Sequence, residues 1–294
     1  MSNSADAKRG IDHLVLPVSD LDVARQSYER LGFTCTPDAY HPFGTKNFLV
    51  QLQGSFLEIL AVHDRGIFPA PGPEDFSFPH YNDGFLARNG EGFSMLVMDS
   101  NDPGTDRADF MDAGLNVHAP FSFGRVAVLP DGTQANVGFE LTFVTDTGMP
   151  DCGFFTCHQV HPPELFWKPD YQRHANTARS IKTVVLAGED WRDHVTFLEG
   201  FTGTQAEISS DHARFRTLRG DVVAGTPVFS AGIFCMQPPA YETLRFLGYE
   251  IQIADFHSAR DCLDAAGLKF VGVGEQCIIF PSDQLHGVPI AFSV

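Results

Sequence analysis

Apolar positions in the first sixty residues recur first at strand spacing and then at helix spacing. Residues 11–18 form a short apolar run rich in β-branched side chains, which predicts a buried strand. A helix start signal follows at Ser19-Asp20, and apolar residues at helical spacing continue over 21–31. Three further strands are predicted at 33–36, 47–52 and 56–62, separated by Pro, Gly and Ser. The order strand, helix and three strands defines one βαβββ unit.

This order of elements returns along the rest of the chain. The opening strands of the later units are predicted at 93–98, 181–186 and 249–253, each followed by a helix. The third unit is completed by strands predicted at 214–218 and 228–236. Residues 63–89, rich in Pro, Gly and Phe, predict a long loop that serves as a linker or as a lid.

Such repetition excludes a Rossmann-type alternation, which needs a helix after nearly every strand. We therefore expect an α+β fold in which repeated βαβββ modules pair into cupped mixed sheets, with four modules in two pairs. Residues 10–170 would form the pair that carries a site, and residues 178–294 a second, degenerate pair.

Two residues of the first unit do not suit a plain apolar core. Glu58 lies inside the apolar run 56–62, and His13 lies inside the first strand. A buried carboxylate is costly unless a positive charge accompanies it, and its own strand contains nothing basic. A cation held between strands, with a histidine as co-ligand, would meet this need. The alternative is that Glu58 faces solvent on an edge strand and His13 is an ordinary hydrogen-bonded core histidine.

The chain resembles the vicinal oxygen chelate superfamily, which includes glyoxalase I, bleomycin-resistance proteins and extradiol dioxygenases, and especially its glyoxalase-like branch. The segments that carry the resemblance are Ile11-Asp12-His13-Leu14-Val15, Asp20-Leu21, Leu31-Gly32-Phe33, His41-Pro42-Phe43-Gly44-Thr45-Lys46-Asn47 and Leu57-Glu58-Ile59-Leu60. The resemblance implies that each module contributes metal ligands from its first and last strands. It also implies that two modules close a cupped sheet around a divalent metal.

Aligning the second unit on the first places Ser94 at the position of His13 and His158 near that of Glu58. His13, Glu58 and His158 would then form a two-histidine, one-carboxylate set, suited to a divalent metal such as Fe, Mn, Zn or Ni. Open positions on such a metal would accept an oxygen-chelating substrate. Ser94 departs from the His, Glu or Gln of most of the superfamily, so a site without metal stays open as an alternative.

Three further side chains are candidates for contact with a substrate or for catalysis. His41, in a turn-rich segment, is a candidate general base or hydrogen-bond donor. Asn47 could orient a substrate oxygen, or belong to a tight turn. Arg125 would pair with a substrate carboxylate if it faces the cup, and is a surface charge if it does not. With Ser94, Asn47 and Arg125 complete the predicted substrate-binding residues.

Composition narrows the range of partners. A formal net charge of −17 argues against nucleic acid or an anionic membrane. The six cysteines show no metal-ligand or disulfide spacing, and no export signal or transmembrane run is visible, which predicts a cytoplasmic protein with reduced cysteines. In the second pair of modules Thr183 takes the first-strand position and the closing strand, 288–292, has no carboxylate. That pair is predicted to be structural or to serve association, which leaves a homodimer open.

The favoured hypothesis is a cytoplasmic metalloenzyme, a lyase, isomerase or dioxygenase, that acts on a small oxygen-chelating molecule. The principal alternative is a metal-free protein that binds or sequesters a small molecule, of the bleomycin-resistance type. A catalytically silent dimerising scaffold is a third hypothesis, but it leaves a buried Glu58 unexplained.

Overall fold

The computed structural model describes residues 7–128, 132–274 and 276–294. Strands of the first half are β1 (Ile11–Pro17), β2 (Ala39–Tyr40), β3 (Thr45–Gln51), β4 (Phe56–Val62), β5 (Met95–Asp99), β6 (Asn116–Val117), β7 (Phe121–Val128), β8 (Gln134–Thr145) and β9 (Gly153–Gln159). Helices of this half are α1 (Leu21–Arg30), η2 (Arg65–Ile67), α2 (Phe78–Asn89), α3 (Pro103–Asp112) and α4 (Pro163–Phe166).

Strands of the second half are β10 (Ala178–Ala187), β11 (Ala206–Ile208), β12 (His212–Arg216), β13 (Asp221–Gly225), β14 (Arg245–Ile253), β15 (Val271–Val273), β16 (Cys277–Phe280) and β17 (Ile290–Ser293). Its helices are η3 (Trp191–His194), α5 (Val195–Thr202), α6 (Pro227–Ile233), α7 (Phe256–Ala265) and η4 (Ser282–Gln284).

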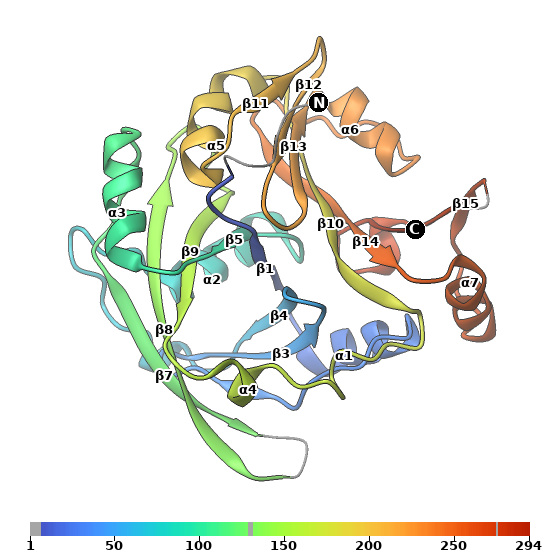
Figure 1. Cartoon of the computed structure of the whole chain (residues 1–294), viewed down its shortest axis with the longest axis horizontal. Helices are drawn as coiled ribbons and strands as arrows, with labels where there is room; N and C mark the ends of the chain where they lie inside the picture. The colour runs from blue at the N-terminus through green and yellow to red at the C-terminus, as the bar shows by residue number, and fades with distance from the viewer. Residues whose placement is uncertain (1–6, 129–131, 275) are drawn as a thin grey trace.

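Each half folds into one mixed sheet, and the two sheets follow the same plan (Figure 1). The first has the order β2-β3-β4-β1-β5-β9-β8-β6, with β7 paired to β8, and the second has the order β11-β12-β13-β10-β14-β17-β16-β15. In both sheets the first strands of two modules lie side by side and antiparallel, β1 against β5 and β10 against β14. The predicted fold class, paired βαβββ modules in cupped mixed sheets, is confirmed.

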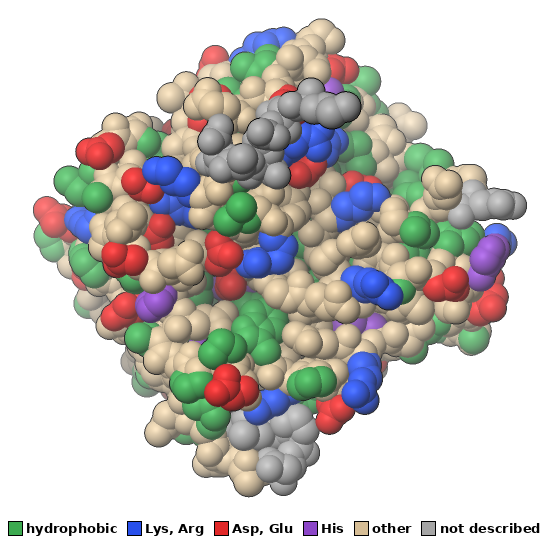
Figure 2. Space-filling view, viewed as in Figure 1, with side chains coloured by type: hydrophobic (Ala, Val, Ile, Leu, Met, Phe, Trp, Pro, Cys, Tyr) green, Lys and Arg blue, Asp and Glu red, His purple; other side chains and the backbone are tan. Residues whose placement is uncertain are grey.

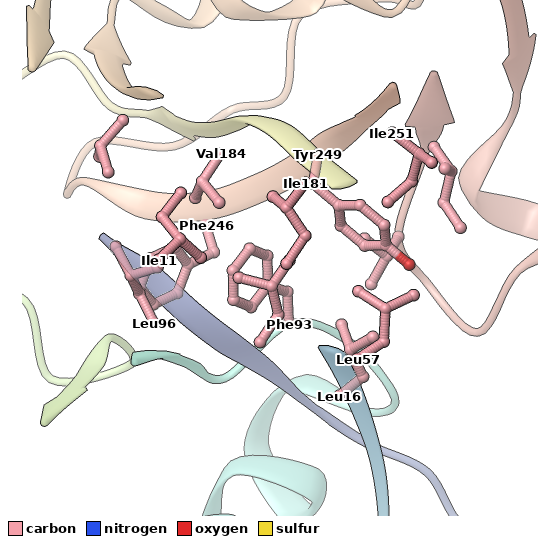
Figure 3. Packing of buried hydrophobic residues seen from close by; sticks show 14 of the residues in the cluster. Ile11, Leu16, Leu57, Phe93, Leu96, Ile181, Val184, Phe246, Tyr249 and Ile251 are labelled. Carbon is pink, nitrogen blue, oxygen red and sulfur yellow. The ribbon is translucent and has the colours of Figure 1, made fainter. Parts of the chain in front are cut away.

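The two sheets share one apolar core. Its largest cluster includes Ile11 and Leu96 from the first sheet together with Val184, Phe246 and Tyr249 from the second. Figure 3 shows these side chains meeting between the sheets. One face of the first sheet is therefore committed to packing against the other half. Its opposite face, where a smaller cluster with Val15, Met95 and Phe155 lies, is the one available for a site.

The strand predicted at 33–36 is not formed, since the first strand after α1 is β2. Local sequence explains most elements and two other departures from the prediction. Asp20 accepts hydrogen bonds from the amides of Asp22 and Val23 and so begins α1, as expected of an N-cap. The predicted strand over 228–236 is wrong, because α6 covers much of it. Pro227 suits the first turn of a helix, and Thr226 caps the amide of Phe229 at 3.2 Å.

The second departure concerns residues 63–89. They are not a structureless loop, since α2 occupies 78–89. This helix places Phe78 and Asn82 against the first sheet, and both side chains are buried.

Charged side chains of both signs lie beside one another on the face shown in Figure 2. Arg219 of the second half pairs with Asp99 of the first at 2.8 Å and donates to the carbonyl of Ile11. In the part of the chain that the structure describes, no helix is both long and apolar enough to cross a membrane.

Candidate functional site

A bulge in β1 sets the direction of Asp12 and His13. Ile11 pairs with Met98 of β5 and His13 pairs with Val97, so Asp12 is an extra residue in the strand. Both side chains are buried, and Asp12 Oδ2 lies 2.6 Å from His13 Nδ1. Because a carboxylate only accepts, the hydrogen sits on Nδ1 and donates to Asp12. The lone pair of His13 Nε2 is thereby directed away from Asp12.

Glu58 lies on β4, which is flanked by β3 and β1 and is not an edge strand. Its side chain is buried, with 5% of the residue exposed, so the alternative that it faces bulk solvent is wrong. Glu58 Oε2 lies 3.7 Å from His13 Nε2, and Oε1 lies 3.7 Å from His41 Nε2. Oε1 also accepts a hydrogen bond from Asn47 Nδ2 at 2.5 Å.

His41 and Asn47 hold the Glu58 carboxylate from the other side. Asn47 Nδ2 is 3.3 Å from His41 Nε2, and an amide nitrogen only donates, so Nε2 accepts and Nδ1 donates to Thr45 Oγ1 at 2.7 Å. Burial lowers the pKa of His41 well below its ordinary value, and the positive charge of Arg125, joined by that of His13 whenever it is protonated, lowers the pKa further. His41 is therefore neutral at neutral pH.

A cavity, here called the cup, opens over this polar cluster. Phenylalanines make most of its wall: Phe43, Phe56, Phe78, Phe123, Phe139, Phe155 and Phe166. The His13 ring stacks on Phe56 with centroids 4.3 Å apart, and His41 stacks on Phe43 at 4.9 Å. The cup has a cavity volume of about 40 Å³. It is narrow, and suits a small and mostly apolar occupant.

Arg125 reaches the cup from β7. The residue is half-buried, and its Nε is sealed from solvent with no hydrogen-bond partner among the described residues. Burial lowers the pKa of Arg125, while the Glu58 carboxylate raises it. The guanidinium carbon lies 5.7 Å from the centroid of the Phe139 ring. Arg125 therefore faces the cup. Of the two predicted alternatives, a residue in the cup or a surface charge, the structure has the first.

Ser94 does not line the cup. Its Oγ donates to Asn82 Oδ1 at 2.7 Å and lies 3.3 Å from the carbonyl oxygen of Val15, which ties α2 to the sheet. The register of β1 on β5 pairs His13 with Val97 and Val15 with Met95. The counterpart of His13 in the second module is therefore Met95, one residue further on. Successive strand residues point to opposite faces, so this one-residue difference moves Ser94 out of the site.

His158 does not join His13 and Glu58 either. Its Nδ1 lies 3.1 Å from the Ser100 carbonyl, and the residue lines another cavity, together with Asp99. Its neighbour Cys157 lines the cup instead. Val97 pairs with Phe155 as Val15 pairs with Glu58, so Phe155 is the counterpart of Glu58. The expected set of three ligands is thus only partly assembled: His13 and Glu58 meet, and His158 lies elsewhere.

The residues present do not fit the divalent metal that the resemblance implies. A protein site for such an ion usually offers at least three ligands. Here the second module presents Met95 and Phe155, and the Asn47 amide occupies His41 Nε2. Within residues 7–128, 132–274 and 276–294, no group of three or more His, Cys, Asp or Glu side chains could hold a metal ion.

Two features of the site are not foreseen by the sequence analysis. Asp12 belongs to the opening motif, and an acidic residue next to a histidine inside a buried strand is a signal that could have shown its role. The phenylalanine wall is distributed over several strands and helices, and composition alone could not say which rings line the cup.

The fold and the site together define the class of protein. Paired βαβββ modules with a polar cluster enclosed in one cupped sheet are the architecture of the vicinal oxygen chelate superfamily. Within it, the chain belongs to the glyoxalase-like domain family, which matches residues 11–202.

Solved structures with the same fold are distant in sequence. A hypothetical protein from Staphylococcus aureus has a TM-score of 0.69 and 13% identity, covering 97% of this chain and 99% of that one. A mutant of 4-hydroxymandelate synthase from Streptomyces coelicolor has a TM-score of 0.61 and 13% identity, covering 97% and 92%. A Mn(II)-bound glyoxalase from Novosphingobium aromaticivorans has a TM-score of 0.57 and 10% identity, covering 98% and 82%. At this identity they show the fold alone. No curated protein matches the chain.

Proposed function

We propose that this protein is a glyoxalase-like lyase or isomerase in which Glu58 moves a proton on a small molecule held in the cup. The observation that carries the proposal is the position of Glu58. A carboxylate is buried in an aromatic cavity, 3.7 Å from each of two imidazole nitrogens and hydrogen-bonded to an amide. Burial of this kind is costly for stability and is typical of residues kept for chemistry.

The proton transfer uses Glu58 as general base. Glu58 Oε2 takes a proton from a carbon next to a carbonyl group, the C–H bond breaks, and its electrons move to the carbonyl oxygen to give an enolate. Return of the proton to a different atom completes an isomerisation. If the enolate electrons instead move back and expel a leaving group from the next carbon, the reaction is an elimination.

His13 and Asp12 form the second part of the proton path. His13 Nε2 faces the protonated Glu58 and can accept its proton, while Asp12 stabilises the resulting imidazolium through Nδ1. Asp12 also lines the second cavity, with Asp99 and His158, so the path ends near solvent. Such a connection gives the base a way to exchange its proton between turnovers.

Asn47 and His41 act as positioning residues. The Asn47 amide binds Oε1 of Glu58 and leaves Oε2 free for the substrate. His41, neutral and fixed by Thr45, holds the second hydrogen of that amide. Fixing the base in this way lowers the entropic part of the activation barrier.

Two other functions remain as alternatives. A metal-free protein that sequesters a small molecule is favoured by the phenylalanine wall, but storage needs no chain of Asp12, His13 and Glu58. A metalloenzyme, lyase or dioxygenase, would have to hold its ion with His13 and Glu58 and at most one further ligand. Metal content of protein purified without chelator separates this case from the proposal.

Exchange of carbon-bound hydrogen in D2O tests the proposal. Small 2-oxo and 2-hydroxy acids with aryl or branched-alkyl bodies are incubated with the protein, and loss of the α or β proton signal is followed by NMR. We expect exchange with the parent protein and a fall of about 10²–10⁴-fold for Glu58→Gln. Glu29→Gln, a change at an exposed position on α1, is the matched control and should leave exchange unchanged. An equal rate in Glu58→Gln and parent would refute the proposal.

A further inference from the structure

Two opposite charges face the same cup without forming an ion pair. Glu58 and Arg125 both line it, yet the basic side chains within 4.0 Å of the Glu58 carboxylate in the described residues are the imidazoles of His13 and His41. No described carboxylate lies within 4.0 Å of the Arg125 nitrogens. Removing a guanidinium from water without a partner is expensive. The Nε–H of Arg125 is a buried donor that a negatively charged group of a ligand in the cup would complete.

Arg125 lies between the cup and an adjoining cavity. Together with Leu49 and Phe166 it lines both, and the adjoining cavity also contains Asp38, Lys168 and Tyr171. In Figure 1 its strand, β7, runs beside β8 as a long hairpin at the edge of the first sheet. A ligand that enters from the adjoining cavity passes the guanidinium before it reaches Glu58.

Unused hydrogen-bonding atoms of two residues that line the cup are complementary to one kind of ligand. Arg125 Nε is a buried donor without an acceptor in the described structure, and Asn47 Oδ1 is a buried acceptor without a donor there. An anion is repelled by Glu58 and attracted by Arg125. The negative end of a ligand must therefore lie at Arg125, its apolar body against the phenylalanines, and a donor group near Asn47.

We infer that Arg125 is the anion-binding residue of the cup and that the ligand is a small monocarboxylate with an aryl or branched-alkyl body. The Arg125 guanidinium supplies a positive charge in the same cup as Glu58. The resemblance to the superfamily implied that a divalent metal ion would supply this charge. A planar fork of N–H donors binds a carboxylate through two parallel hydrogen bonds, which a metal-free site can use for both charge and orientation. The binding role of Arg125 does not depend on the proposed function. Only the position of the reacting carbon beside Glu58 rests on that proposal.

Calorimetric titration with 3-phenylpropanoate and 4-methylpentanoate, and with their uncharged primary amides, tests the inference. We expect the parent to bind at least one acid about tenfold or more tightly than its amide. In Arg125→Gln the affinity for the acid should fall by about 10- to 100-fold, while amide affinity stays the same and reports that the cup is intact. Arg260→Gln, an exposed change on α7, is the matched control and should bind the acid as the parent does.

Two additional arms separate this inference from the proposed function. Acid binding should persist in excess EDTA, and in Glu58→Gln it should be unchanged or tighter, because a like charge has been removed. If the parent protein binds the acid but catalyses no hydrogen exchange, the proposed chemistry of Glu58 is refuted while the binding role of Arg125 stands. Equal binding of acid and amide, parent-like acid binding by Arg125→Gln, abolition by EDTA, or no binding of either acid at millimolar concentration would each overturn the inference.

Discussion

The two halves of the molecule share a strand order but differ in what they place at equivalent positions. Val15 pairs with Glu58 in the first sheet, and Val185 pairs with Val223 in the second. Matching Val15 to Val185 places Thr183, two residues earlier, at the position of His13. Thr183 and Val223 therefore occupy the positions of His13 and Glu58.

The corresponding face of the second sheet is also closed. Phe234, at the end of α6, packs there with Val185 and Leu247, and all three are buried. In the first half the equivalent connection contains α2, whose Phe78 reaches only one wall of the cup. The comparison shows that this architecture forms a packed face by default. A site requires both polar residues at two strand positions and a connection that leaves space above them.

Moving the charge to the second half should have the largest effect. Val223→Glu places a carboxylate in a fully buried apolar position. The guanidinium of Arg214, which is paired with Val223 across β12 and β13, is already engaged by Asp221 at 2.7 Å. We expect about 3–5 kcal/mol loss of unfolding free energy, measured by urea denaturation. Val228→Glu, at a position 69% exposed, is the control and should change stability by less than about 0.5 kcal/mol. Tolerance of Val223→Glu would mean that the second half can accept a site.

Removing the Asp12 carboxylate, which is hydrogen-bonded to His13, should have the next largest effect, a lower rate of hydrogen exchange. Asp12→Asn keeps the shape of the side chain but no longer stabilises a charged His13. Hydrogen exchange should slow by about 10- to 100-fold with little change in ligand affinity. Asp22→Asn, at an exposed position in the first turn of α1, serves as its control. A loss of affinity without loss of rate would show that Asp12 only supports the fold.

The core shared by the two halves can be tested at one hydrogen bond. Tyr28 and Tyr249 are both buried, and their hydroxyl oxygens are 3.4 Å apart. Burial raises the pKa of both phenols, so both remain protonated. Tyr28→Phe should lower the unfolding free energy by about 1 kcal/mol, and Tyr28→Phe with Tyr249→Phe should cost less than twice that. Strict additivity would indicate that the two hydroxyls do not interact.

A surface contact between the halves should give the smallest effect. Burial raises the pKa of Glu91, but hydrogen bonds from Ser19 and His286 outweigh it and hold the pKa below its ordinary value. A lowered folded-state pKa gives stability that is present above the unfolded pKa, near 4.3, and is lost as pH falls through the folded value. Glu91→Gln should therefore cost a few tenths of a kcal/mol at pH 7, and its difference from the parent should vanish as the pH falls through the folded-state pKa of Glu91. Denaturation repeated over a series of pH values below 7 measures it.

Much of the fold, and part of the site, could be predicted from the sequence. Repetition of strand and helix spacing was sufficient for the module order, and the apolar run around Glu58 indicated a buried carboxylate near a histidine. Aligning the second module on the first predicts the wrong positions for Ser94 and His158, because an error of one residue in the register places a side chain on the opposite face of the strand. The α6 segment was predicted as strand, since a short apolar run does not separate a buried helix from a strand. The bulge at Asp12 has no sequence signal that a single chain reveals.

The strand that carries Arg125 and the strand that carries Glu58 are held differently by the sheet. β7 pairs with β8 and lies off the main path of the sheet, whereas Glu58 is on a strand flanked on both sides. Changes of length or sequence in the hairpin could alter which acids are admitted without disturbing the geometry around Glu58. If the proposed function holds, preference for a substrate and the ability to transform it should be separable by mutation, and redesign for a new acid should begin at β7.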